Sequence, residues 1–176
     1  MPARYSHLPL IWLLSDARND ANLEEALRAL PQRSGFIYRH YHLPDGQRRA
    51  RFDTLAHVAR AHGHALAVSR GEGWGEEFVY GSDPPIVDTP WLAATHDAAQ
   101  MDQAIRLGAV ALFLSPVFTT RSHPAAQTLG IHGFHVLAQR SPLPVIALGG
   151  MNATRARELN WPRWGAIDGL VAAQDA

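Results

Sequence analysis

The sequence predicts an α/β protein, and within that class a (β/α)₈ TIM barrel. Apolar runs of strand length alternate along the chain with patterns of helical period, and this alternation implies parallel βαβ units. Eight strand patterns occur in 176 residues, or about 22 residues per unit, against about 31 in a barrel of ordinary size. We therefore expect one compact barrel domain spanning residues 1–176. A doubly wound open sheet is the rival, but no G-x-G-x-x-G motif follows a strand pattern here.

The first half of the chain contains four strand patterns, at residues 8–14, 35–42, 65–69 and 78–80. Between the first two, residues 21–30 place Leu23, Ala26, Leu27 and Leu30 on one helical stripe.

A second helix is predicted at residues 49–62, where Phe52, Leu55, Ala56 and Ala59 recur at helical spacing and Gly63 ends the pattern. The link at residues 70–77 is rich in glycine and too short for a full helix. We therefore expect a reduced helix after the third strand.

The second half contains the other four strand patterns, at residues 91–95, 110–114, 144–148 and 167–172. Helices are predicted at residues 97–107, 132–140 and 153–159, with Asn152 as the N-cap of the last one. The chain ends at Ala176, soon after the eighth strand, so we expect the final helix to be missing. The barrel surface left bare would be apolar, which favours a homo-oligomer in which a partner subunit covers it.

The composition excludes several classes of function. The 16 basic side chains are all arginine, they balance 16 acidic ones, and the chain has ten histidines and no cysteine. Without lysine or cysteine there is no Schiff-base amine, P-loop lysine, disulfide or thiolate metal site. A neutral balance argues against a nucleic-acid partner. No run of about 20 apolar residues and no signal peptide occur, so we expect no membrane partner and a cytoplasmic protein.

Ligands of such barrels bind at the C-terminal ends of the strands, so polar residues at those positions are the candidates. At the end of the second strand, Tyr38, His40 and His42 share one face of an extended chain, while Arg39 and Tyr41 share the other. One set must point into the barrel, and we select Tyr38, His40 and His42 as site residues. The alternative is a strand end that is simply exposed to solvent.

Residues 115–124 form the densest cluster of hydroxyl and basic side chains, and they follow the sixth strand. Gly149 and Gly150 follow the seventh, where glycine lets backbone N–H groups approach an anion. Together these loops predict a phosphate site, although a tight turn also explains the two glycines. Asp97 beside His96 is interpreted as a helix N-cap, and no H-x-x-x-H motif predicts a zinc site.

Four segments resemble motifs of the thiamine phosphate synthase/TenI family. Residues 115–123, Ser-Pro-Val-Phe-Thr-Thr-Arg-Ser-His, resemble the family's G-P-V-F-x-T-x-[ST]-K loop. Residues 144–151, Pro-Val-Ile-Ala-Leu-Gly-Gly-Met, are similar to its P-V-x-A-I-G-G-I strand. Residues 94–96 resemble its S-x-H element and residues 108–114 its G-A-D-Y segment. Their order and spacing agree with the family from about residue 8 to the end.

The resemblance implies a barrel that joins hydroxymethylpyrimidine pyrophosphate to a thiazole phosphate with Mg²⁺ and no organic cofactor. By motif, Thr120, Ser122 and His123 would hold the leaving pyrophosphate. The thiazole phosphate would be held by Gly149 and Gly150, with backbone at Ala172 and Ala173.

The same resemblance places the family's Q-x-R-x-K strand on Tyr38, His40 and His42, so that His40, His42 and His123 replace its cations as candidate catalytic residues. Asp83 falls close to the second magnesium aspartate, whereas the family's Asn-Asp pair falls near Ser69 and Arg70.

We therefore expect an enzyme, a thiamine phosphate synthase-like transferase acting on small phosphorylated substrates. The alternatives are a non-catalytic or regulatory barrel that binds a thiazole or thiamine phosphate, and another phosphate-handling isomerase or lyase with His40 or His42 as base. Histidine has a pKa of about 6.5. Histidine cations would therefore lose pyrophosphate affinity between about pH 6 and 8.

Overall fold

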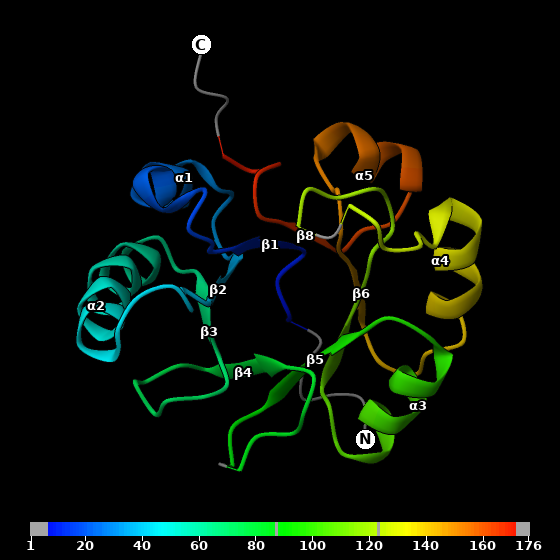
Figure 1. Cartoon of the computed structure of the whole chain (residues 1–176), viewed down its shortest axis with the longest axis horizontal. Coiled ribbons are helices and arrows are strands. Elements are labelled where there is room, and N and C mark those ends of the chain that lie inside the picture. The colour runs from blue at the N-terminus through cyan, green and yellow to red at the C-terminus, as the bar shows by residue number, and fades with distance from the viewer. Residues whose placement is uncertain (1–6, 87, 123, 172–176) are drawn as a thin grey trace.

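Eight parallel strands close into a barrel in the order in which they occur along the chain (Figure 1). The computed structural model describes residues 7–86, 88–122 and 124–171. The strands are β1 (Ile11–Leu14), β2 (Gly35–Tyr38), β3 (Ala65–Ser69), β4 (Phe78–Gly81), β5 (Trp91–Thr95), β6 (Ala111–Leu114), β7 (Val145–Ala147) and β8 (Trp164–Ala166). The helices are the 3₁₀ turn η2 (Asp20–Asn22) and α1 (Leu23–Ala29), α2 (Asp45–Ala61), α3 (Ala98–Arg106), α4 (Gly130–Ala138) and α5 (Ala153–Leu159). The predicted α/β barrel is confirmed.

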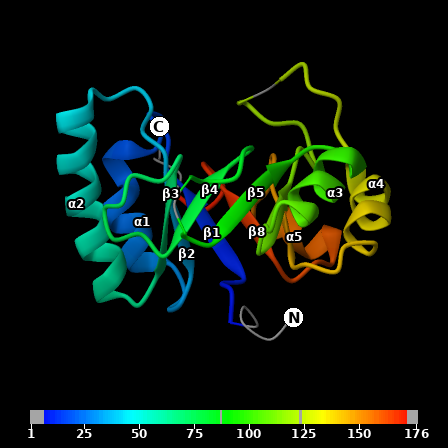
Figure 2. The same ribbon diagram turned by 90° about the horizontal axis from the view of Figure 1, so that it is seen from below.

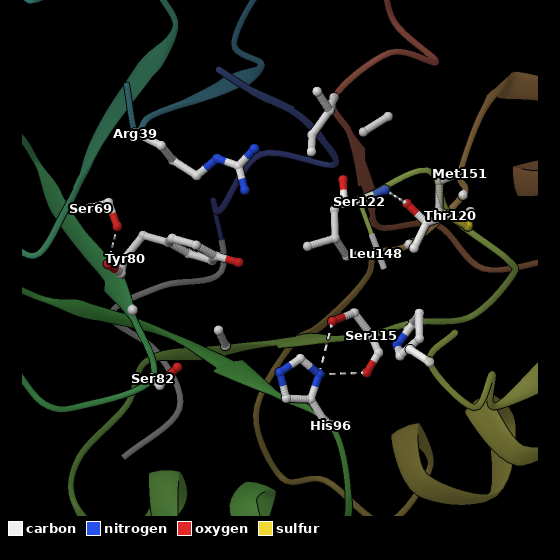
Figure 3. Close-up of a pocket in the computed structure, with 18 of the residues that line it drawn as sticks. Arg39, Ser69, Tyr80, Ser82, His96, Ser115, Thr120, Ser122, Leu148 and Met151 are labelled. Atoms are coloured by element: carbon white, nitrogen blue, oxygen red, sulfur yellow. Dashed lines mark hydrogen bonds between the residues drawn. The ribbon is translucent and has the colours of Figure 1, made fainter. Parts of the chain in front are cut away.

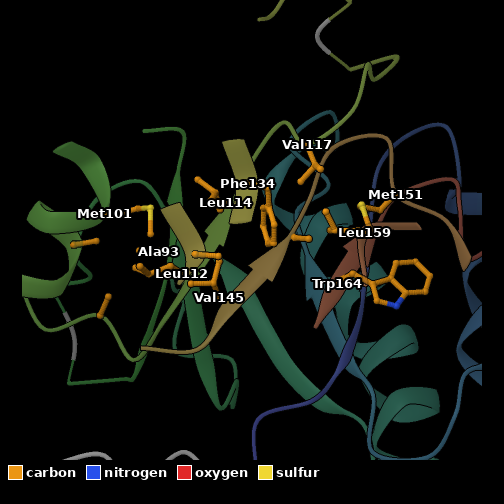
Figure 4. Close-up of a cluster of buried hydrophobic side chains, with 14 of the residues drawn as sticks. Ala93, Met101, Leu112, Leu114, Val117, Phe134, Val145, Met151, Leu159 and Trp164 are labelled. Atoms are coloured by element: carbon orange, nitrogen blue, oxygen red, sulfur yellow. The ribbon is translucent and has the colours of Figure 1, made fainter. Parts of the chain in front are cut away.

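The helices cover the barrel from two sides. Helices α1 and α2 lie outside β1–β3, and α3, α4 and α5 lie outside β5–β8 (Figures 1 and 2). Each group covers its own apolar cluster. Phe36, Tyr38 and Phe52 are wholly buried under α1 and α2. Figure 4 shows the cluster under α3–α5, in which Phe134 and Leu159 are wholly buried.

The barrel interior is a packed core and not a channel. The indole of Trp12 is wholly buried and makes edge contacts with Phe113 and Phe78, at ring separations of 5.6 and 6.2 Å. Gly35 faces this indole from β2, and a Cβ at that position would lie 2.2 Å from it. Glycine at the start of β2 is therefore required by the tryptophan of β1, and Gly35 and Ile37 mark the inner face of β2.

Two links on one side of the barrel lack a helix. Residues 70–77 between β3 and β4 contain none, where a reduced helix was predicted, and neither do the described residues of the β4–β5 link, 82–86 and 88–90. The glycine-rich first link is folded around the carboxylate of Glu76. That carboxylate accepts hydrogen bonds from the backbone N–H groups of Glu72, Gly73 and Trp74 at 2.6–2.9 Å. The glycine-rich sequence thus forms a loop that is closed by hydrogen bonds to the carboxylate of Glu76.

Some predicted boundaries were wrong. Strand β2 ends at Tyr38 and not at residue 42, because His40 adopts a left-handed φ of 42° and turns the chain toward α2. Helix α2 begins at Asp45, before the predicted residue 49. The N-caps Asp97 and Asn152 are confirmed, since their side chains accept hydrogen bonds from the N–H groups of residues 100 and 155.

The eighth strand was predicted at residues 167–172 and lies instead at Trp164–Ala166. Trp164 pairs with both Ile11 and Ala147. Gly165 faces the interior, where a Cβ would lie 3.2 Å from Leu14. The prediction failed because a strand that contains an inward glycine has no apolar run to mark it.

The segment after β8 takes the place of a helix. Leu170 packs against both outer clusters, and Val171 packs against the cluster under α1 and α2. The described residues 167–171 form no helix, in line with the prediction. Among the helices described, none is both long and apolar enough to cross a membrane.

Candidate functional site

A pocket of about 1100 Å³ lies at the C-terminal ends of the strands (Figure 3). Each of the eight strands is followed by at least one residue that lines it. These residues include Arg18, Arg39, Arg70, Asp83, His96, Ser115, Gly149 and Asp168. Figure 3 shows Arg39 and Tyr80 pointing into the space from one side and His96 and Thr120 bordering it on the other. The pocket therefore occupies the place where barrels of this class bind ligands.

Arginine dominates the charge of this pocket. Its described lining contains five guanidinium groups and two carboxylates, Asp83 and Asp168. The arginines are Arg18, Arg39, Arg70, Arg121 and Arg155. Guanidinium stays charged at all physiological pH values and matches the geometry of phosphate oxygens. The excess of positive charge favours an anionic ligand.

Arg39 is held in place by the loop after β1. Its Nη2 lies 3.0 Å from Asp16 Oδ2, its Nε donates to the carbonyl of Ser15 at 2.8 Å, and its backbone N–H donates to the Ser15 hydroxyl. The guanidinium is therefore positioned before any ligand arrives, and only part of its donor set is used.

Arg18 links three loops at the rim of the pocket. Its Nη2 donates to the Ser122 hydroxyl at 2.9 Å and lies 3.7 Å from Asp168, while its Nε lies 3.2 Å from Asp16. The loops after β1, β6 and β8 thus meet at one guanidinium. An anion that displaced Ser122 or Asp168 would find this charge already in place.

The side formed by β3 and β4 is polar and aromatic. The Tyr41 hydroxyl forms a hydrogen bond with the Ser69 hydroxyl, and the guanidinium of Arg70 lies 5.1 Å from the Tyr41 ring centre. Burial raises the pKa of the Tyr80 phenol to about 12, with Arg39 opposing and Tyr41 adding to the shift. Tyr80 therefore stays protonated at neutral pH and can donate a hydrogen bond.

His96 is the histidine of the described pocket lining. Its Nδ1 lies 2.8 Å from the carbonyl oxygen of Ser115 and 3.2 Å from the Ser115 hydroxyl. Because a carbonyl only accepts, Nδ1 carries a proton in this contact, which leaves Nε2 as the acceptor of the neutral ring. His96 is thereby oriented to accept a proton or a hydrogen bond at Nε2.

Gly149 and Gly150 allow the loops after β6 and β7 to touch. Their φ angles are 95° and 63°. A Cβ would lie 2.6 Å from Pro116 at the first position and 2.4 Å from the Thr119 carbonyl at the second. The tight-turn alternative thus accounts for the glycines themselves. The turn also brings in a cation, because Arg155 Nη1 donates to the Gly150 carbonyl at 2.6 Å.

Several predicted site residues line the pocket, namely Asp83, Thr120, Ser122, Gly149 and Gly150. Thr120 and Ser122 lie in one turn, where the Ser122 N–H donates to Thr120 Oγ1 at 3.3 Å. His123, Ala172 and Ala173 lie outside the described residues.

Tyr38 and His40 lie on the opposite side of the strand wall from the pocket. Tyr38 is wholly buried against Phe52, and its hydroxyl donates to the carbonyl of Arg48 at 2.7 Å. The ring of His40 stacks on Tyr38 at 4.7 Å, and that of His42 lies 5.0 Å from His40. None of the three lines the pocket, so the structure gives no support to the sites proposed for them.

The inner face of β2 is the one that carries Ile37, and beyond the strand Arg39 and Tyr41 line the pocket. The inward series is therefore Ile37, Arg39 and Tyr41, one residue earlier than the series selected from the sequence, and it contains an arginine. The sequence did hold a signal for this register. Gly35 opposite the indole of Trp12 fixes which face is the inner one.

Sequence reasoning missed most of the pocket arginines. Arg155 lies on helix α5, and Arg70 lies in a loop whose path no periodic pattern predicts, whereas Arg121 belongs to the predicted phosphate loop at residues 115–124. Arg39 had been assigned to the wrong face of its strand.

The described residues do not reproduce the Asn-Asp pair that the resemblance implies for Mg²⁺. Ser69 and Arg70 line the pocket where the resemblance places Asn-Asp, and Asp168 faces Arg18. Mg²⁺ is bound through carboxylates together with substrate phosphates, and Asp83 alone is a sparse donor set. Within the described residues, the one group of three potential ligands close together lies outside this pocket, at Asp20, His40 and His42.

Part of the chain is similar to known proteins in sequence, and the whole barrel is similar to solved structures in fold. A family model described as thiamine monophosphate synthase matches residues 93–166. The thiamine-phosphate synthase of Chloroflexus aurantiacus is 33% identical over 88 residues, which cover 47% of this chain and 40% of that protein. A putative thiamine-phosphate synthase 2 of Aquifex aeolicus is 36% identical over 58 residues, covering 33% of this chain and 31% of that protein. The matched segments thus span less than half of either curated relative.

Among solved structures, the thiamine phosphate pyrophosphorylase of Pyrococcus furiosus superposes with a TM-score of 0.80 at 20% identity. The superposition covers 96% of this chain and 90% of that one. A structure described as native KDPGal gives a TM-score of 0.60 at 15% identity, over 100% and 90% of the two chains. At these identities the likeness shows the barrel fold.

Proposed function

Because the comparisons support a divergent member of the thiamine phosphate synthase/TenI family, we propose that this chain couples hydroxymethylpyrimidine pyrophosphate to a thiazole phosphate. The products are thiamine phosphate and pyrophosphate. The observation that carries the proposal is the set of five arginines around one pocket that also holds the Thr120 and Gly149 loops. Two phosphorylated substrates need two anion sites in one cavity, and this lining supplies cations on both sides.

The proposed reaction breaks the bond between the pyrimidine methylene carbon and the pyrophosphate oxygen. Pyrophosphate leaves with the electron pair, and the thiazole nitrogen lone pair then forms the new C–N bond. No protein nucleophile is needed, so the chain's task is positioning and the stabilisation of charge on the leaving group.

In this proposal, different residues of the pocket bind the leaving pyrophosphate and the thiazole phosphate. Arg39 and Arg18 stabilise the leaving pyrophosphate, with hydrogen bonds from Thr120 and Ser122. Arg155, held on the Gly150 carbonyl, attracts the thiazole phosphate toward the loop after β7. The Tyr80 hydroxyl and His96 Nε2 remain as polar contacts for the two rings.

The proposal assigns neutralisation of the leaving group to arginine. A magnesium ion would meet Asp83, and that role stays a prediction, but no step here depends on it. Fixed guanidinium groups can stabilise the charge of the leaving pyrophosphate, because their own charge needs no metal and no protonation equilibrium.

One observation favours a second function, a barrel that binds a thiazole or thiamine phosphate without turnover. Arg70 lines the pocket where the resemblance expects the Asn-Asp pair. A pocket with more cations and fewer carboxylates holds phosphorylated ligands tightly, including a product. The isomerase or lyase alternative loses its support, since neither His40 nor His42 lines the pocket.

The test is a coupled assay with both substrates, with and without Mg²⁺, in which thiamine phosphate is separated and quantified. The proposal expects product from the wild type and a large loss in Arg39→Gln. Arg49→Gln is the matched control. Arg49 pairs with Asp53 on the solvent-exposed surface of α2, and neither residue lines the pocket. Binding of thiamine phosphate without product would favour the second function, and absence of both would overturn the two together.

A further inference from the structure

A second polar cluster lies outside the barrel wall, where the loops after β1 and β2 meet. The Nε2 of His40 lies 2.8 Å from Asp20 Oδ1, and the imidazole of His42 lies beside that of His40. One ligand atom from each of the three side chains falls within 4.8 Å of the other two. The pocket lining includes none of them.

We propose that Asp20, His40 and His42 form a binding site for a divalent transition metal ion such as Zn²⁺, Co²⁺ or Ni²⁺. Two imidazoles and a carboxylate are donors that these ions accept, whereas Mg²⁺ prefers oxygen alone. Zinc bonds to such ligands are about 2.0–2.2 Å long, so tetrahedral ligand atoms lie about 3.4 Å apart. Separations of 2.8 to 4.8 Å bracket that value, and small side-chain rotations would close the site.

The surroundings of His40 resemble those of a metal-binding histidine, whose second ring nitrogen forms a hydrogen bond that fixes the ring. Its Nδ1 lies 2.8 Å from the Ser15 hydroxyl, which also accepts the backbone N–H of Arg39 at 2.7 Å. The Ser15 hydroxyl can accept a hydrogen bond from a protonated Nδ1, and in that tautomer the Nε2 lone pair is left for the ion. The ring is wholly buried and stacked on Tyr38, so its orientation is fixed before an ion binds.

The charges around the site suit a cation. Arg51 is the competitor, because its Nε donates to Asp20 Oδ1 at 2.7 Å. The same guanidinium also bonds both oxygens of Glu24, at 2.5 and 3.1 Å. The single positive charge of Arg51 is shared by the carboxylates of Asp20 and Glu24, so one negative charge is not neutralised by this arginine. A divalent ion would take up that charge while Arg51 stays on Glu24.

Access and consequence follow from the exposure of the ligands. His42 is exposed, and 32% of the Asp20 side chain is accessible, so an ion can enter from solvent. Bound there, it would tie η2 to the chain leaving β2. Arg39 immediately precedes His40 and bonds Ser15, so the clip would also stiffen the support of a pocket arginine.

The experiment is a calorimetric titration of the tag-free, EDTA-treated and dialysed protein with Zn²⁺ and, separately, with Co²⁺. We expect one equivalent to bind and His42→Ala to weaken that binding at least tenfold, about the loss expected for a metal-site partner. The matched control is His57→Ala, an exposed histidine on α2, which should bind as the wild type does.

His42→Ala leaves the buried His40 and Arg51 contacts intact, so loss of fold does not confuse the result. The visible absorption of bound Co²⁺ gives a second readout, and its bands should change in His42→Ala and not in His57→Ala. If no binding is detected at metal concentrations up to about 1 mM, the Kd is weaker than the millimolar range, and the proposed site would be overturned. Equal affinity in wild type and His42→Ala would do the same. No substrate is used, so the outcome is independent of the proposed activity.

Discussion

The two halves of this barrel differ in how well they match the family model. The half from β5 to β8 contains the whole stretch matched by the family model, residues 93–166, and its motif loops after β6 and β7 pack directly on each other. The half from β1 to β4 lies outside that match. It supplies Arg18, Arg39 and Arg70 to the pocket, and the described residues of the links after β3 and β4 contain no helix. One half of the barrel thus carries the recognisable motifs, while the facing half adds positive charge to the pocket through residues that no motif marks.

The largest effect is expected from breaking the loop contact of the β5–β8 half. Gly150→Ala puts a Cβ 2.4 Å from the Thr119 carbonyl at a φ of 63°. We expect a loss of about 3 kcal/mol in the free energy of unfolding, from backbone strain and overpacking. Urea unfolding measures it.

The matched control for that substitution is Gly46→Ala in α2, where a Cβ meets nothing within 4 Å. Alanine there should stabilise the protein by about 0.5–1 kcal/mol. Equal effects at the two glycines would show that the contact between the motif loops is not the constraint described above.

The β1–β4 half is tested by Arg39→Gln. Loss of a charged hydrogen-bond donor costs about 1.5–3 kcal/mol, so pyrophosphate binding should weaken by about 10- to 100-fold. Calorimetric titration with pyrophosphate measures the change, with Arg49→Gln as control. An unchanged affinity would mean that the motif loops bind the anion without the facing half.

A smaller effect is expected at the helix-less link of the same half. Burial raises the pKa of Glu76, but hydrogen bonds from the backbone N–H groups of its loop outweigh it and hold the pKa below the usual value. A depressed carboxyl pKa stabilises the fold above the unfolded pKa, and that contribution is lost as pH falls through the folded pKa. Glu76→Gln should therefore cost about 1–2 kcal/mol near pH 7 and little at acid pH.

Thermal unfolding of Glu76→Gln across pH values measures this effect, and exposed Glu25→Gln is the control. A destabilisation of Glu76→Gln that stays the same down to strongly acid pH would rule out the carboxylate as the cause.

The sequence predicted the barrel well because its evidence is periodic. Apolar runs mark β3 and β5 to the residue, and side-chain caps mark the starts of α3 and α5. It failed at β8, where an inward glycine interrupts the apolar signal, and at the end of β2. At the end of β2, His40 has a left-handed φ that ends the strand, and the alternation of side chains in the sequence does not predict this backbone conformation.

Most of the predicted residues that line the pocket lie in the β5–β8 half, and Asp83 after β4 is the exception. Thr120, Ser122 and Gly149 were found because they lie within local motifs. Arg39 and Arg155 were not found, since the position of Arg39 depends on the register of a strand and that of Arg155 on how a helix docks. The expected homo-oligomer stays a prediction. Leu170 and Val171 already cover part of the surface that suggested it, and light scattering would test it.

Titration of the metal-free protein with pyrophosphate at about pH 6 and 8, in EDTA, tests the central claim most directly. Guanidinium groups keep their charge throughout this range. An arginine pocket therefore predicts binding at both values, with no fall in affinity as pH rises. Affinity that disappears toward pH 8, as titrating histidines require, or binding that appears only when Mg²⁺ is added, would contradict it.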